Sequence, residues 1–396
     1  MGNFYLVVID GLGAGAQEDA GDYGDAGSNT LQHVSESTGV KLPNFARLGL
    51  GNIIPLPSVP PVDNPEAAFG KMREHSAGKD STTGHWELAG IQLEKAFPTY
   101  PQGFPEEVIR AFSQLTGRGI LANKPASGTR VIEDFGDEHV QTGKPIVYTS
   151  ADSVFQVACH VDVVPVSQLY EWCTLAREKV MTGKHGVGRV IARPFAGESG
   201  SYYRLSDQRH DFSYIPPEPN LLTVLQDAGT KTFSVGKVID LFAERGFTQY
   251  RRTKSNDEGI AQLLNVMSAA ENSFVFVNLI DTDQIYGHRN DVTGYAGCLE
   301  NIDRALPALL KKIKPGDVML FTGDHGNDPI HPGTDHTREF VPLLVYPAAS
   351  CTDIDLGTRD TFSDVACSVA DFYNVKGTFR GKSFIMKRFK TDHQEV

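Results

Sequence analysis

A dense group of acidic and imidazole residues, placed directly after an apolar run, constrains the fold of this chain most. Apolar residues 318–321 are followed by two Asp-His pairs, at 324–325 and 335–336, with His331 between them. Carboxylate and imidazole groups at the end of a buried strand cost free energy to desolvate unless they meet a metal or an opposite charge. Mixed oxygen and nitrogen donors suit Zn²⁺ or Mn²⁺. The segment predicts a metal site, the alternative being Asp-His pairs that occur in a loop by chance.

Two further segments share this character. Apolar residues 4–9 predict a buried strand followed by Asp10, and residues 274–280 predict another, followed by Asp283 and His288. Because ligands of open α/β sheets gather at the carboxyl ends of the strands, these side chains are expected at one sheet edge. The glycine-rich turn after Asp10 lacks the spacing of a dinucleotide fingerprint, which disfavours a dinucleotide site.

The segment GKDSTTGH, residues 78–85, offers a group that could react at such a site. A hydroxyl in a turn flanked by glycine can act as a nucleophile when a metal lowers its pKa. Ser81 is the preferred hydroxyl, and Thr82 and Thr83 remain open. A structural alternative is that Ser81 or Thr82 caps a helix through residues 86–88. Both can hold, since a helix N-terminus also attracts phosphate.

In chain order, these motifs resemble the alkaline phosphatase superfamily and, within it, the phosphopentomutase family. The metal motifs alone indicate only the superfamily. The resemblance runs nearly end to end, and the segments TSADS (149–153) and GRVIAR (188–193) narrow it to the mutases. Other matching segments are KDSTTGHWE (79–87), NKPASGT (123–129), RTKSN (252–256) and PIHPGTDH (329–336).

The resemblance implies an α/β fold. Its core would be alkaline-phosphatase-like, with a central mixed, mostly parallel sheet flanked by helices, and a smaller α/β cap domain would be inserted into it. It also implies two Mn²⁺ ions bridged by a phosphorylatable hydroxyl. Carried over by motif, the ligands of one ion are Asp283, His288 and His336, and those of the other are Asp10, Asp324 and His325.

The phosphorylatable hydroxyl falls on Ser81, where the family usually carries Thr. Other members of the superfamily use Ser in an equivalent Asp-Ser step, so the chemistry is retained. The resemblance further implies that Ser150, Asp152 and Arg189 of the insert contact the substrate, with Lys237 from the core. The planar fork of an arginine suits phosphate, although a surface ion pair would also explain Arg189 and a turn would also explain Asp152.

The implied reaction interconverts the 1-phosphate and 5-phosphate of ribose or deoxyribose through a phosphoserine enzyme and a sugar bisphosphate. A sugar bisphosphate activator is expected with it. The alternatives are a related two-metal phosphatase and a cofactor-independent phosphoglycerate mutase, which would be expected to carry a longer insert. A non-catalytic binding protein is a third, disfavoured because all six proposed ligands are present.

Composition and charge limit the classes of molecule that the protein is expected to bind. The chain has 396 residues and a formal charge of −12 without a sustained basic tract, which disfavours nucleic acid. Its five cysteines are scattered and form no Cys-x-x-Cys pair, as expected in a reducing cytoplasm. No apolar run approaches the length of a membrane span. We expect a monomer acting on small pentose phosphates, with an oligomer left open.

The positions of the metal motifs predict the domains. They occupy residues 1–90 and 280–340, so we expect a discontinuous core of residues 1–95 and 214–396 and an insert of residues 96–213. Proline-rich stretches at 97–101 and 215–219 are the expected hinges.

Several elements are expected within these domains. In the insert we expect strands at 145–148 and 189–192 and a helix at 167–181. In the core we expect an amphipathic helix over 295–313 and a strand at 341–346. The proline of that strand predicts an edge position or a strand end. Four histidines are expected to be structural or solvent-facing: His85, His160, His185 and His210. Coordination by His331 is left open.

Overall fold

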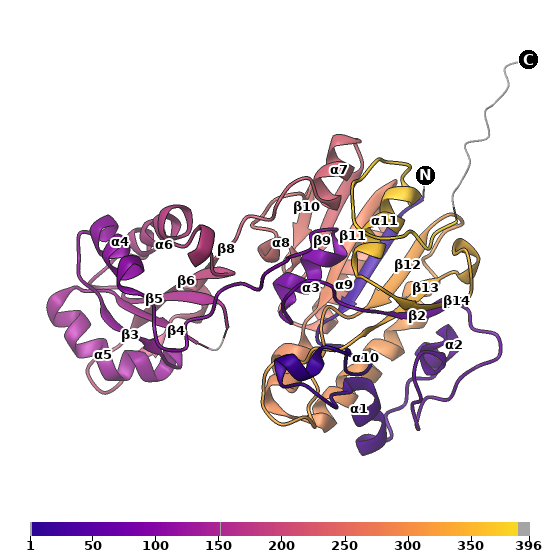
Figure 1. The fold of residues 1–396 in the computed structure, drawn as a ribbon, viewed down its shortest axis with the longest axis horizontal. Coiled ribbons are helices and arrows are strands. Elements are labelled where there is room, and N and C mark those ends of the chain that lie inside the picture. The colour runs from indigo at the N-terminus through magenta and orange to yellow at the C-terminus, as the bar shows by residue number, and fades with distance from the viewer. Residues whose placement is uncertain (1, 151, 387–396) are drawn as a thin grey trace, which may run out of the picture. The chain divides into compact units, whose positions relative to one another are not determined.

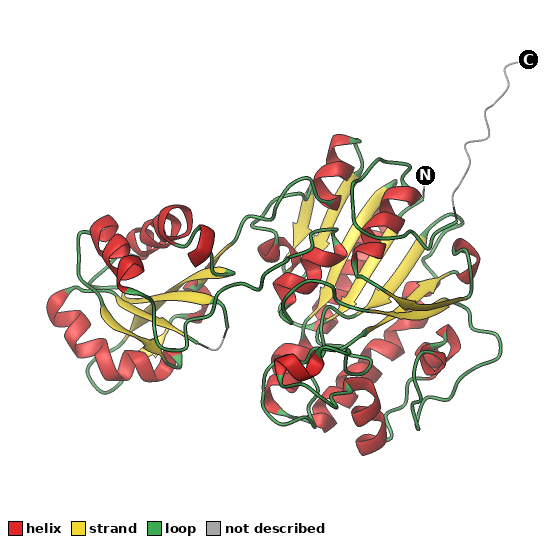
Figure 2. Cartoon of the chain, viewed as in Figure 1, coloured by secondary structure: helices red, strands yellow, loops and turns green. Residues whose placement is uncertain are grey.

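The computed structural model of the protein describes residues 2–150 and 152–386. Its chain forms strands and helices throughout, and the predicted α/β class is confirmed (Figures 1 and 2). Two compact units are present: Met1–Lys95 with Pro216–Val396, called the core unit, and Ala96–Ile215, called the insert unit. Within the described residues, no helix is long and apolar enough to cross a membrane.

The core unit contains an eight-stranded sheet in the order β10-β9-β11-β1-β12-β13-β2-β14. All neighbouring strands are parallel except those that flank β13, which runs antiparallel to both β12 and β2. The three strands predicted at the metal motifs are β1, β11 and β12, and they are confirmed. The strands are β1 (Phe4–Ile9), β2 (Ala68–Met72), β9 (Lys231–Val235), β10 (Gln249–Arg251), β11 (Ser273–Leu279), β12 (Val318–Thr322), β13 (Val341–Tyr346) and β14 (Asp355–Arg359).

Helices cover both faces of this sheet (Figure 2). Successive side chains of a strand point to opposite faces. Accordingly, Tyr5, Val7 and Ile9 of β1 join one apolar cluster, while the Phe4 ring packs edge-on against Phe372, with centroids 5.4 Å apart. The first face carries α1 (Thr30–Thr38), α2 (Pro43–Leu48), α9 (Asn256–Ala269) and α10 (Val292–Leu310); the second carries α3 (Ser81–Leu88), α7 (Leu221–Asp227), α8 (Val238–Leu241) and α11 (Ser363–Phe372). Helix α10 confirms the amphipathic helix expected there, although Ile313 lies beyond its end.

The strand predicted at 341–346 is present as β13, but an edge position for it is wrong. It lies between β12 and β2, inside the sheet. The alternative, a strand end, is confirmed, since Pro342 is the second residue of β13 and the ladder to β12 begins only at Leu343. Proline is tolerated at this point because no bonded pair to β12 faces it.

The insert unit has its own sheet, in the order β3-β4-β5-β6-β7, with β8 paired to β6. Two apolar clusters lie on its faces, one with α4 and α6 and the other with α5. The predicted strands at 145–148 and 189–192 are present in β4 and β6. The predicted helix at 167–181 is α6, continued by a π-helical turn at Ala176–Val180. The elements are β3 (Leu121–Pro125), β4 (Ile146–Thr149), β5 (Val154–His160), β6 (Arg189–Ala196), β7 (Tyr203–Arg204), β8 (His210–Ser213), α4 (Glu106–Thr116), α5 (Gly128–Thr142) and α6 (Val166–Leu175).

Candidate metal centre

Three parallel strands of the core unit end together and deliver the candidate ligands. The register pairs Ile9 of β1 with Leu279 of β11, and Val8 of β1 with Thr322 of β12. The residues that follow these strands therefore emerge at one edge of the sheet, where open α/β sheets bind their ligands.

The first candidate group consists of Asp10, Asp324 and His325, all buried, with potential ligand atoms within 4.8 Å of one another. Nε2 of His325 lies 3.4 Å from Asp10 Oδ1 and 3.4 Å from Asp324 Oδ2. Gly11 has a left-handed backbone, with φ of 75°, and its N–H donates to Asp324 Oδ1. This turn brings the ends of β1 and β12 into register.

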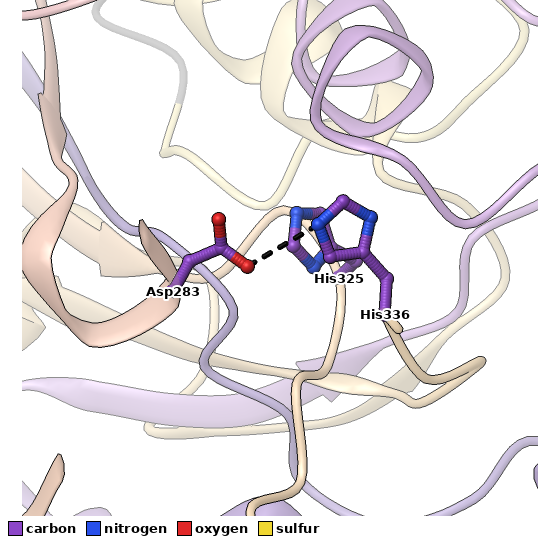
Figure 3. A group of neighbouring side chains, drawn as sticks. All are labelled: Asp283, His325 and His336. Atoms are coloured by element: carbon purple, nitrogen blue, oxygen red, sulfur yellow. Dashed lines mark ion pairs between the residues drawn. The ribbon is translucent and has the colours of Figure 1, made fainter. Parts of the chain in front are cut away.

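The second candidate group consists of Asp283, His325 and His336 (Figure 3). Asp283 Oδ1 lies 3.2 Å from His336 Nε2, the ion pair drawn in the figure. His288 joins this group, since its Nε2 lies 3.5 Å from Asp283 Oδ2 while its Nδ1 is 2.7 Å from the main-chain oxygen of Thr334. Asp283 itself lies in a π-helical turn, Thr282–Tyr286, a feature frequent at functional sites.

All six predicted ligands thus lie in one cluster, and His325 belongs to both groups. The donor set fits divalent metal. Two buried ligand atoms, Oδ2 of Asp324 and Nε2 of His336, make no hydrogen bond within the described part of the chain. Both atoms lie in ion pairs, Asp324 Oδ2 with His85 Nδ1 at 3.1 Å and His336 Nε2 with Asp283 Oδ1 at 3.2 Å, so a bound cation would take the place of these contacts.

The shifted pKa values of the cluster reflect a strongly negative electrostatic potential. Burial lowers the pKa of His325, but Asp324, Asp10 and Asp283 outweigh it and raise the value to about 10. The hydrogen bond to Asp283 raises the pKa of His288 to about 9. Burial raises the pKa of Asp283, yet its neighbouring histidines hold it well below the ordinary value. A field that stabilises protons so strongly also attracts metal cations.

The segment with the candidate nucleophile opens helix α3. The structural alternative, in which Ser81 or Thr82 caps this helix, is wrong. The N-cap is Asp80, whose side chain accepts hydrogen bonds from the N–H groups of Thr82 and Thr83 and from the Thr83 hydroxyl, at 2.6 Å. A carboxylate satisfies two main-chain donors at once, so it displaces the hydroxyls from this role. Ser81 is consequently free to point elsewhere.

Helix α3 lies against the turn after β12. A Cβ atom on Gly84 would come within 2.0 Å of the main-chain oxygen of Asp324, so this approach requires glycine. The close contact places Ser81 Oγ 3.1 Å from His325 Nε2 and 3.5 Å from Asp10 Oδ1. Lys237 donates to the same hydroxyl at 2.9 Å and pairs with Asp10 Oδ2 at 2.5 Å.

Several residues that orient the ligands were missed from the sequence. Asn278 Nδ2 donates to Asp10 Oδ2 at 3.0 Å and faces Nε2 of His85, whose Nδ1 lies 2.8 Å from the main-chain oxygen of Ser81. Asn327 donates to Asp283 Oδ1 at 2.7 Å. A buried amide in the apolar run of β11 was the one available signal for Asn278. His85 agrees with its expected structural role and belongs to neither candidate group.

Three predicted substrate contacts lie in the insert unit. Arg189 is half-buried at the start of β6 and forms ion pairs with Asp152 at 3.6 Å and Asp211 at 3.4 Å. Ser150 follows β4 and is half-buried, whereas Asp152 is exposed. The fourth predicted contact, Lys237, lies beside Ser81 in the core unit.

Among the described residues, the other histidines singled out from the sequence, His160, His185, His210 and His331, belong to neither group. His331 is the histidine left open, and its Nδ1 lies 3.1 Å from the main-chain oxygen of Pro332. His160 is buried in the insert unit, and its main-chain N–H donates to His139 Nε2. His185 contacts Tyr100 and Glu107.

Comparison with known proteins identifies the family. A model of the Metalloenzyme superfamily matches residues 2–377. A phosphopentomutase of Caldanaerobacter subterraneus subsp. tengcongensis is 52% identical over 380 residues, which cover 96% of each chain. The chain belongs to the phosphopentomutase family. A phosphopentomutase of Dictyoglomus thermophilum is similar at 49% identity over 381 residues, covering 96% of this chain and 97% of the other.

A solved structure is similar at the level of the fold. It is a Leishmania mexicana phosphoglycerate mutase studied at low cobalt concentration, with a TM-score of 0.50, 13% identity and 98% of each chain covered. Membership of the phosphopentomutase family makes this protein an isomerase. Together with the two candidate groups, the superfamily match identifies divalent metal as its cofactor.

Proposed function

We propose that the protein interconverts the 1-phosphate and 5-phosphate of ribose or deoxyribose, a reaction that agrees with the name phosphopentomutase of its relatives. The observation that carries the proposal is the position of the Ser81 hydroxyl. It lies in contact with Lys237, with His325, which belongs to both candidate groups, and with Asp10. A hydroxyl at the junction of two cation sites suits phosphoryl transfer.

In the proposed cycle, Ser81 carries a phosphoryl group in the resting enzyme. The group passes to the free hydroxyl of the sugar phosphate, and the Ser81 Oγ–phosphorus bond breaks as the new sugar oxygen–phosphorus bond forms. Ser81 then accepts the other phosphoryl group of the sugar bisphosphate. A sugar bisphosphate would load the enzyme in the same way, which explains the expected activator.

Two Mn²⁺ ions are the proposed cofactors. Asp283, His288 and His336 would hold one ion, and Asp10, Asp324 and His325 the other. When bound, such ions neutralise the charge of a phosphoryl group and favour ionisation of a hydroxyl.

Lys237 contributes a fixed positive charge beside Ser81. Burial lowers its pKa, but the carboxylates of Asp10, Asp283 and Asp324 outweigh burial and raise it, so the ammonium stays charged. A charged ammonium beside the nucleophile stabilises the phosphoryl group that we propose there.

The insert unit is the proposed cap, with Ser150, Asp152 and Arg189 binding the sugar phosphate. Arg189 is half-buried and pairs with Asp152 at 3.6 Å and Asp211 at 3.4 Å, so its guanidinium would have to exchange one of these carboxylates for the phosphate. Asp152 is exposed and could accept hydrogen bonds from sugar hydroxyls. We further propose a monomer, since one chain supplies all six ligands, and a reducing cytoplasm, where the five free thiols are stable.

The test combines an isomerisation assay with mass spectrometry of the purified protein. We expect conversion of ribose 5-phosphate into ribose 1-phosphate, and a phosphate on the peptide that contains Ser81. Release of inorganic phosphate without isomerisation would favour a two-metal phosphatase. Isomerisation of phosphoglycerate, with none of the pentose phosphate, would favour the phosphoglycerate mutase alternative.

A further inference from the structure

Arg338 is a buried cation that no step of the proposed cycle uses. Only 3% of its side chain is exposed, and it stands two residues after the candidate ligand His336. A charge in this position requires extensive hydrogen bonding to offset its desolvation.

The guanidinium of Arg338 binds one short segment of the chain several times. Nη1 donates to the main-chain oxygens of Ser76, at 2.8 Å, and Gly78, at 2.6 Å, and to Glu74 Oε2 at 3.0 Å. Nη2 donates to the main-chain oxygen of Glu74 at 2.8 Å, and both Nη2 and Nε contact the carboxylate of Asp19. Three carbonyl groups of residues 74–78 thus depend on this one side chain.

Residues 74–78 connect β2 to the helix that Ser81 opens, and they contain no helix or strand. Two of their N–H groups are bound by another side chain, since Glu87 of α3 accepts from the N–H of His75 at 2.9 Å and of Ser76 at 2.6 Å. Arg338 thus binds three carbonyl oxygens of this segment and Glu87 binds two N–H groups, while the N–H of Ala77 donates to the main-chain oxygen of Leu93 at 2.8 Å. Buried main-chain groups without regular structure need such side-chain partners.

A second link runs parallel to the first. The main-chain N–H of Arg338 donates to Asp25 Oδ2 at 2.9 Å, and the same carboxylate accepts from Lys79 Nζ at 3.0 Å. Lys79 is separated from Ser81 by a single residue. Arg338 is therefore connected to the residues before helix α3 in two ways: its side chain binds residues 74–78, and its main chain is linked through Asp25 to Lys79.

We propose that Arg338 is a positioning residue, which sets the placement of Ser81 relative to the ligand segment that carries His336. The inference rests on the proposed function, because it assigns Ser81 as the nucleophile. Lysine cannot replace arginine here, since one ammonium cannot reach three carbonyl oxygens and two carboxylates at once. A displacement of a reacting group by about 1 Å can reduce the rate roughly a hundredfold.

The test is an Arg338→Lys variant of the full-length, metal-loaded enzyme. We expect kcat for ribose 5-phosphate to fall by about ten- to a hundredfold while KM changes by less than about twofold, since the contacts to substrate are intact. Phosphorylation of Ser81 by a sugar bisphosphate, followed by mass spectrometry, should slow by the same factor. Manganese bound per chain should stay at the wild-type value, which separates misplacement of Ser81 from loss of a ligand.

Arg359→Lys is the matched control. Arg359 also joins a carboxylate, Asp364 at 2.6 Å, to a main-chain oxygen, that of Lys382 at 2.9 Å, but these partners do not hold the nucleophile segment. It should retain wild-type kcat and Ser81 phosphorylation. If Arg338→Lys does not fold, Glu74→Gln replaces one oxygen of a partner by an amide group with little change in shape and should lower kcat in the same pattern.

Wild-type kcat and phosphorylation in Arg338→Lys, or in Glu74→Gln where that variant replaces it, would overturn the positioning role. A rise in KM without a fall in kcat would overturn it as well. Failure of the proposed function looks different, because the wild-type enzyme itself would then neither isomerise ribose 5-phosphate nor carry phosphate on Ser81.

Discussion

The ammonium of Lys237 donates a hydrogen bond of 2.9 Å to the hydroxyl of Ser81, and it also lies 2.5 Å from Asp10 Oδ2. One side chain thus contacts both the proposed nucleophile and a proposed metal ligand. The ammonium would compete with the metal ion that we propose at Asp10, and it would face the phosphoryl group that we propose on Ser81.

Lys237→Met should therefore have two opposite effects. Metal affinity at the group with Asp10 should rise, because a competing cation is removed. Formation of the phosphoserine should slow by about a hundredfold, as expected for the loss of one preorganised positive charge. Manganese titration and rapid-quench phosphorylation measure the two effects, and a weaker metal site in this variant would contradict the first.

The hydroxyl of Ser81 can be tested by two substitutions. Ser81→Ala should reduce kcat by about a thousandfold or more, since the group that we propose carries the phosphate is gone. Ser81→Thr should retain much of the activity, because the extra methyl group mainly restricts χ1. Full activity of Ser81→Ala, with phosphate found on Thr82, would show that another hydroxyl is the nucleophile.

The proposed division of the ligands predicts separable metal losses. His288→Ala should weaken one ion, and Asp324→Ala should weaken the other, so that each variant keeps about one tightly bound ion. His325→Ala should weaken both, because this ring lies in both candidate groups. Anomalous scattering at the manganese edge can locate the ion that remains. Equal loss of both ions from the first two variants would leave the division without support.

Metal binding should release protons. The pKa values of His288, about 9, and of His325, about 10, lie above the ordinary histidine value, so both rings are protonated at pH 7 in the metal-free protein. Metal ligation requires neutral rings, so metal affinity should rise as the pH increases from 7 through 9 towards 10. Calorimetry in buffers of different ionisation enthalpy counts the protons.

The same shifts predict the stability of the metal-free protein. A raised histidine pKa contributes stability that is fully present below about pH 6.5 and is lost as the pH rises through 9 and 10. Denaturant unfolding in the presence of a chelator should follow this direction. If the metal-free protein became more stable between pH 6.5 and 10, the raised pKa values of His288 and His325 would be contradicted.

Arg189 tests the role of the insert unit. Arg189→Ala should cripple the isomerisation of ribose 5-phosphate, by about a hundredfold if orientation of the sugar is lost, while Ser81 still accepts phosphate. Water should then remove that phosphate slowly, so weak phosphatase activity should accompany the loss of mutase activity. Lys184→Ala is a control in the same unit, since Lys184 forms an ion pair with the exposed Glu107, at 2.8 Å. Wild-type turnover in Arg189→Ala would show that the insert unit does not orient the sugar through this residue.

Local sequence patterns predicted the strands well. They failed where residues elsewhere in the fold determine the position of a strand or the cap of a helix. Residues 4–9, 274–280 and 318–321 are apolar apart from Asn278, as expected of parallel strands covered on both faces, and all three form the centre of the sheet. Pro342 suggested an edge, yet β13 is interior, because the position of a strand depends on partners far away in the chain. Asp80 took the capping role expected for a hydroxyl, because its carboxylate reaches two N–H groups at once.

By itself, the sequence determined the chemistry that this protein can carry: carboxylates and imidazoles after three buried strands, and a hydroxyl in a turn flanked by glycine. These are short-range patterns, visible because burial and ligand type are encoded within a few residues. Only the tertiary structure decided that His325 belongs to both groups, that Lys237 meets Ser81, and that Arg338 holds Gly78, 260 residues away in the chain. Such contacts follow from the order of the strands and the packing of α3 against the sheet, and no local pattern records them.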